Sequence, residues 1–151
     1  NPAVYYRSQA PGEHRRIGGG MAETARRVLL ADDEPSIVKV VEMLLKRSGY
    51  EVLTARDGEE ALQICRSEKL DAAILDLMMP KRSGLEVCKL LRQEEGTRTL
   101  PIVLYTGKGK EMKEETLREW GANAFVDKTE DGRVLLSKLA AAIAEGASGG
   151  P

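Results

Sequence analysis

Short apolar segments alternate along the chain with segments whose apolar residues recur at helical spacing. The short segments predict buried strands at residues 27–31, 51–55, 72–75, 101–105 and 124–126. The intervening segments predict five helices: one opening at Pro35 and closed by Gly49, one over 58–69, one containing 85–92, a charged one containing 112–120, and one containing 134–143. Strands separated by helices favour a parallel sheet with helices on both faces, and therefore an α/β fold.

The two ends of the chain lack this pattern. Residues 1–25 show no periodicity and contain the triplet Gly18-Gly19-Gly20, so we expect a flexible N-terminal tail or linker. Residues 146–151 are rich in glycine and are expected to be a C-terminal linker or tail. Between them, residues 26–145 are expected to form a single domain.

Composition excludes several classes of protein. With 42% hydrophobic residues the chain of 151 residues is globular, and a net charge of -1 gives no reason to expect direct nucleic-acid binding. No apolar segment approaches the roughly 20 residues that a membrane helix needs, and no secretory signal is evident. Cys65 and Cys88 are interpreted as buried hydrophobic residues of a reducing compartment. We therefore expect a cytoplasmic protein without membrane contact.

Polar residues follow four of the five predicted strands. Asp32, Asp33 and Glu34 follow the first strand and Asp76 the third, and the set is completed by Thr106, Gly107 and Lys128 after the fourth and fifth. Each alone is more commonly a helix cap, a turn residue or a surface lysine. Together they matter, because ligands of open α/β sheets bind at the carboxyl ends of the strands.

Carboxylates gathered at one sheet edge repel one another and need a cation. Oxygen ligands alone suit a hard ion such as Mg²⁺. A carboxylate beside Mg²⁺, a hydroxyl and a lysine has the groups needed for phosphoryl transfer, with the carboxylate as nucleophile.

Four segments in order resemble the receiver domains of bacterial response regulators. They are LLADDEP at 29–35, ILDLMMPKRSG at 74–84, VLYTG at 103–107 and GANAFVDK at 121–128. The resemblance covers roughly residues 26–144, and the spacing of Asp76, Pro80 and Gly84 is its most specific part. It implies a flavodoxin-like, doubly wound, five-stranded parallel sheet of order 2-1-3-4-5, with 26–145 as the receiver domain.

The resemblance also implies roles for individual residues. Asp76 would be the phosphoacceptor. Asp33 would bind Mg²⁺ directly, Asp32 mostly through water, and the backbone carbonyl of Met78 would be a further ligand beside Asp76 itself.

A second group would bind and report the phosphoryl group. Lys128 would pair with its oxygens, Thr106 would donate its hydroxyl, and Gly107 would keep the pocket open. Phe125 would turn inward, which would change the surface around the fourth helix, fifth strand and fifth helix.

The implied function is a phosphorylation switch in a two-component system. A sensor histidine kinase or phosphotransfer protein would donate the phosphoryl group, and a downstream protein or output domain would read the switched face, with homodimerisation possible there. Such a domain is not an enzyme, although it assists its own phosphorylation and dephosphorylation.

One residue departs from the family pattern, and two other functions compete. Many receivers have proline in a cis peptide after the lysine, where this chain has Thr129, which makes the geometry around Lys128 a question for the structure.

A pseudo-receiver that binds partners without phosphorylation is the main alternative function, although such proteins commonly lose one or more of the residues named above. An aspartate-nucleophile phosphatase would carry a second acid at the position of Met78.

Overall fold

A computed structural model describes residues 25–107 and 113–148 of the chain. Its five strands form one parallel sheet of order β2-β1-β3-β4-β5, which confirms the expected doubly wound α/β fold. The strands are β1 (Arg27–Ala31), β2 (Glu51–Ala55), β3 (Ala72–Leu75), β4 (Ile102–Thr106) and β5 (Ala124–Asp127).

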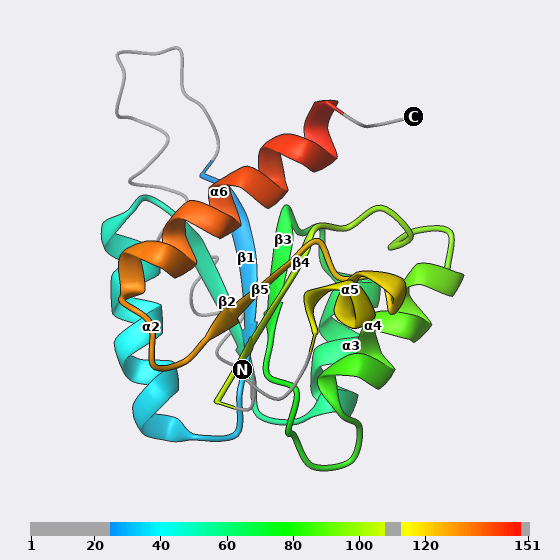
Figure 1. Ribbon diagram of the computed structural model, residues 1–151, viewed down its shortest axis with the longest axis horizontal. Helices are drawn as coiled ribbons and strands as arrows, with labels where there is room; N and C mark the ends of the chain where they lie inside the picture. Colours follow the sequence, from blue (N-terminus) through cyan, green and yellow to red (C-terminus); the bar gives the residue numbers. More distant parts are fainter. Residues whose placement is uncertain (1–24, 108–112, 149–151) are drawn as a thin grey trace.

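Helices follow the strands and cover both faces of the sheet (Figure 1). They are α2 (Pro35–Arg47), α3 (Gly58–Ser67), α4 (Gly84–Gln93), α5 (Glu114–Glu119) and α6 (Gly132–Ser148). The helices α2 and α6 lie on one face, and α3, α4 and α5 lie on the other (Figure 1). Within the described residues, no helix is both long enough and apolar enough to cross a membrane.

The sheet separates two hydrophobic clusters, because successive strand residues point to opposite faces. In β1, Leu29 and Ala31 face the cluster under α3, α4 and α5, while Val28 and Leu30 face the cluster under α2 and α6. Cys65 and Cys88 are free and buried in the first cluster, as expected of small hydrophobic residues. The central strands are thus covered on both faces, which explains their almost continuous apolar sequences.

Local sequence signals set where the helices begin. Asp57 and Ser83 accept hydrogen bonds from the backbone amides of Glu60 (2.8 Å) and Glu86 (3.2 Å), which caps α3 and α4. Helix α2 has no such side-chain cap and begins with Pro35 in its first turn, where the missing amide hydrogen costs nothing.

Element boundaries differ from the predicted ones most clearly in β4 and α6. Strand β4 lies one residue further along than expected, because Pro101 has no amide hydrogen to donate to the sheet. Helix α6 runs through Gly146 to Ser148, into the segment expected to be a tail, and Gly146 lies close to the Pro101 ring. Of the expected N-terminal tail, residues 1–24 lie outside the described residues, as does Met112 of the predicted fourth helix.

Candidate functional site

Strand register brings Asp32 and Asp76 to the same edge of the sheet. Strands β1 and β3 are parallel neighbours in which Ala31 pairs with Leu75, so the next residue of each strand stands at the same level. The Asp76 amide donates to the Ala31 carbonyl at 3.0 Å, which continues the hydrogen-bonded ladder to the phosphoacceptor candidate itself. Both side chains are buried, with 1% exposure for Asp32 and 3% for Asp76.

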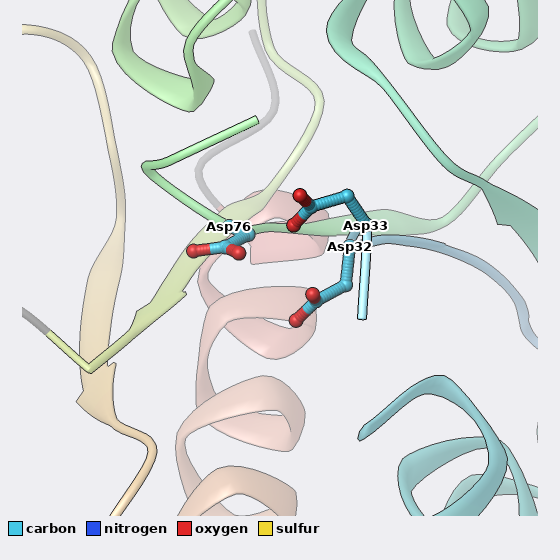
Figure 2. Close-up of side chains that lie close together, drawn as sticks. All are labelled: Asp32, Asp33 and Asp76. Atoms are coloured by element: carbon cyan, nitrogen blue, oxygen red, sulfur yellow. The ribbon is translucent and has the colours of Figure 1, made fainter. Parts of the chain in front are cut away.

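Three carboxylates meet at this edge. One oxygen from each of Asp32, Asp33 and Asp76 lies within 4.8 Å of the others. Figure 2 shows the side chains side by side, with the Asp33 carboxylate turned toward Asp76. Asp33 is exposed, so the cluster is open to solvent on one side. A groove of about 470 Å³ lies next to it, between α2 and the end of β2.

Lys128 reaches this cluster from β5. Its Nζ lies 2.7 Å from Asp32 Oδ2 and 3.1 Å from Asp76 Oδ2, and the side chain is only 11% exposed. It also contacts Glu34 Oε1 at 3.1 Å. One ammonium group therefore faces several carboxylates and cannot neutralise them all.

Electrostatics at the site follow from burial and crowding. Burial raises the pKa of Asp76, and the nearby charge of Asp32 raises it further, while Lys128 and the Met78 amide oppose this shift. Burial alone would lower the pKa of Lys128, but its contacts with Asp32, Asp76 and Glu34 outweigh burial and raise it. Lys128 is therefore a permanent cation at physiological pH.

The donor set fits Mg²⁺. All three side chains offer hard oxygen ligands, and the partner of the buried Asp32 Oδ2 is the Lys128 ammonium at 2.7 Å, which can turn away when a metal ion binds. Carboxylates this close together favour binding of a divalent cation, since each raises the cost of the others' charges. Met78 lies beside them, and its amide donates to Asp76 Oδ1 at 3.3 Å.

Thr106 and Gly107 lie on the other side of Asp76, at the end of β4. Thr106 is buried, pairs with Asp127 across the sheet, and its carbonyl accepts from the Lys128 amide at 3.0 Å. A Cβ added to Gly107 would meet no heavy atom of the described residues within 4 Å.

Phe125 lies in β5, away from the carboxylates. It pairs with Leu104 and is partly buried against the cluster under α3, α4 and α5. The structure thus brings the candidate metal ligands and Lys128 together, while Phe125 packs on the face of the sheet that α3, α4 and α5 cover.

Two features of the site were not assigned from the sequence. Glu34 is one of the carboxylates that contact Lys128, although only its position directly after Asp33 hinted at this. Thr129 follows Lys128 through a trans peptide bond and donates to Asp127, so the turn is closed without the proline that many receivers have.

Comparison with known proteins agrees with this geometry. The sequence profile of the response regulator receiver domain matches residues 28–140. The alkaline phosphatase synthesis transcriptional regulatory protein PhoP of Bacillus subtilis is 45% identical over 103 residues, which are 68% of this chain and 42% of PhoP. The chain therefore spans less than half the length of this relative.

Solved structures show the same fold. Response regulator TrrA from Thermotoga maritima, in complex with Mg²⁺ and BeF, has a TM-score of 0.70 and 35% identity over 78% of this chain and 98% of TrrA. The receiver domain of a sensor histidine kinase from Pseudomonas aeruginosa, with magnesium in its active site cleft, has a TM-score of 0.74 and 26% identity over 80% of this chain and 99% of that domain. This chain therefore belongs to the response regulator receiver domains of two-component signalling.

Proposed function

We propose that this domain accepts a phosphoryl group on Asp76 from the phosphohistidine of a sensor histidine kinase or phosphotransfer protein in the cytoplasm. The observation that carries the proposal is the clustering of Asp32, Asp33 and Asp76 within 4.8 Å, with Lys128 Nζ 3.1 Å from Asp76. These are a nucleophile, a cation site and a counter-charge in one place.

In the proposed reaction, a carboxylate oxygen of Asp76 attacks the phosphorus atom. The new oxygen–phosphorus bond forms as the nitrogen–phosphorus bond of the donor breaks, and the electron pair stays on the donor imidazole. Lys128 turns from the carboxylates to the phosphoryl oxygens, and the Thr106 hydroxyl donates to one of them. Asp33, Asp76 and the Met78 carbonyl would hold Mg²⁺ directly and Asp32 mostly through water, and the ion would supply positive charge that offsets the negative charge on the oxygens of the transferring group.

Phosphorylation would then be read at the helix face next to β4 and β5. Movement of Thr106 toward the phosphoryl group frees space into which Phe125 can turn. That change would alter the surface formed by α5, β5 and α6, where a downstream protein, an output domain or a second copy of the chain would bind. Gly107 would leave the phosphoryl pocket open, and the same site would assist hydrolysis of the acyl phosphate.

Intact-mass spectrometry after incubation with Mg²⁺ and acetyl phosphate tests the proposal. We expect one labile phosphoryl group per chain, absent with EDTA and absent in Asp76→Asn. Asp131→Asn is the matched control, because the exposed Asp131 carboxylate pairs with Arg133, whereas Lys128 pairs with Asp32, Glu34 and Asp76. It should be phosphorylated like the unaltered protein.

No adduct, under conditions that label another receiver domain, would contradict the proposal and favour a pseudo-receiver that binds partners without phosphorylation. An adduct retained in Asp76→Asn would also contradict it. Steady turnover of phosphate esters would instead indicate a phosphatase of the aspartate-nucleophile type.

A further inference from the structure

The turn after β5 is closed by a buried carboxylate on one side of Lys128 and a threonine on the other. Asp127 is 6% exposed, and its Oδ1 accepts from the Thr129 amide at 2.8 Å and from the Thr129 hydroxyl at 2.7 Å. Two donors of one residue thus converge on a single oxygen atom, so the positions of Asp127 and Thr129 are fixed relative to each other.

Further backbone contacts hold the same turn. The Asp127 amide donates to Glu130 Oε1 at 3.0 Å, and the Glu130 amide donates back to the Asp127 carbonyl at 2.9 Å. The Lys128 amide donates to the Thr106 carbonyl at 3.0 Å. Lys128 therefore starts from a backbone held on both sides, at the end of a strand paired with β4.

This matters because lysine is long and flexible. A lysine side chain loses considerable rotamer entropy when its ammonium is held at one point. A fixed backbone limits the directions in which the side chain can extend. In this site the ammonium crosses to Asp32 Oδ2 and Asp76 Oδ2 and is mostly buried. The turn sets the direction in which the side chain leaves β5.

A proline in place of Thr129 could make neither hydrogen bond to Asp127, because it has no amide hydrogen and no hydroxyl. The amide contact to Asp127 needs any residue except proline, whereas the second contact needs a hydroxyl-bearing residue at this position. They hold the turn with a trans peptide bond between Lys128 and Thr129.

We propose that Thr129 is a positioning residue that acts through Asp127 to aim Lys128 at the phosphoryl group on Asp76. This inference rests on the proposed function. The group that the inference concerns is the Thr129 hydroxyl, because every residue except proline would have the backbone amide.

The test compares Thr129→Val, which replaces the hydroxyl by a methyl group of similar size, with Thr129→Ser, which keeps it. We measure the rate of Asp76 phosphorylation by acetyl phosphate, the affinity for beryllofluoride with Mg²⁺, and the affinity for Mg²⁺ alone by calorimetry. Thr99→Val, an exposed threonine remote from the site, is the matched control.

For Thr129→Val we expect the phosphorylation rate and beryllofluoride affinity to fall about threefold to tenfold, the range of one lost hydrogen bond. Mg²⁺ affinity should stay equal or rise, because Lys128 competes with the cation for Asp32 and Asp76. Thr129→Ser and Thr99→Val should behave like the unaltered protein. A general loss of structure would instead lower Mg²⁺ affinity, so the two effects are distinguishable.

Equal phosphorylation of Thr129→Val and the unaltered protein would overturn this inference and leave the proposed function standing. An equal loss in Thr129→Val and Thr129→Ser, together with weaker Mg²⁺ binding, would also overturn it, since the turn would then be only structural. If the unaltered protein takes up no phosphoryl group, the proposed function fails and the positioning role fails with it.

Discussion

Gly84 lets helix α4 begin against the backbone of the proposed phosphoacceptor. A Cβ on Gly84 would overlap the Asp76 carbonyl oxygen and lie 2.9 Å from its carbonyl carbon and 3.1 Å from Leu77 Cα. Backbone atoms cannot turn aside as a flexible side chain can. We expect Gly84→Ala to lower the free energy of unfolding by about 1–3 kcal/mol, measured by urea denaturation, despite the better helix propensity of alanine.

Gly96→Ala is the matched control for this prediction. A Cβ at Gly96 would meet no heavy atom within 4 Å, so the same substitution should change stability by less than about 0.5 kcal/mol. Equal stability of the two variants would show that the Asp76 backbone tolerates displacement. Steric contact with that backbone would then not be the reason for glycine at position 84.

Residue types at the strand ends could be predicted from the sequence, but not every contact between them. Asp32, Asp76 and Lys128 follow predicted strands, so a parallel sheet places all three at the same edge. The contact of Glu34 with Lys128 depends on which way two long side chains turn, and the Asp127–Thr129 contact depends on the turn geometry. Neither leaves a periodic signal in the sequence.

Among the elements, α4 is tied to the connection between α5 and β5 by Arg92. Its guanidinium donates to the Gly121 carbonyl at 2.8 Å, the Asn123 amide oxygen at 3.0 Å and the Arg98 carbonyl at 3.1 Å. Burial lowers the pKa of Arg92, yet the pKa of a guanidinium is so high that it stays charged at neutral pH. Arg92 thus joins an element of the core to the face proposed to be read by partners.

We expect Arg92→Lys to lower the free energy of unfolding by about 1–3 kcal/mol in urea denaturation. Lysine keeps the charge but cannot reach several acceptors at once, so the partly buried Gly121 carbonyl and Asn123 amide oxygen lose donors. Arg66→Lys is the control, because Arg66 pairs with Glu94 at the surface, and it should leave stability unchanged within error. If the two variants behave alike, the planar geometry of Arg92 does not contribute to stability.

Prediction of whole elements succeeded where burial dominates. All four residues of β3 are buried, and an apolar segment of that length between turn residues favours a central strand. The ends of β4 and α6 were harder to predict. Pro101 shifts the start of β4, and an alanine-rich sequence carries α6 beyond Gly146. Boundaries depend on single contacts, whereas the elements depend on a pattern over many residues.

At the scale of the molecule, sheet order decides that the site exists. Asp32 and Asp76 follow β1 and β3, and Thr106 is the last residue of β4. These three strands are neighbours in the sheet although distant in the sequence, and Lys128 follows β5 at the edge. The folded chain thereby gathers like charges that the unfolded chain keeps apart. Folding must overcome this repulsion, so a bound cation should stabilise the whole domain.

We expect Mg²⁺ to raise the free energy of unfolding by roughly 1.4 kcal/mol when its free concentration is tenfold above its dissociation constant, because it binds the folded state alone. Thermal and urea denaturation with MgCl₂, against NaCl at matched ionic strength, measures this effect. In Asp33→Asn, which removes an exposed carboxylate of the cluster, most of the gain should disappear, while stability without Mg²⁺ should not fall because one repulsive charge is gone. An equal gain from NaCl would show general charge screening and no specific Mg²⁺ site. A full Mg²⁺ effect in Asp33→Asn would place the cation elsewhere on the molecule.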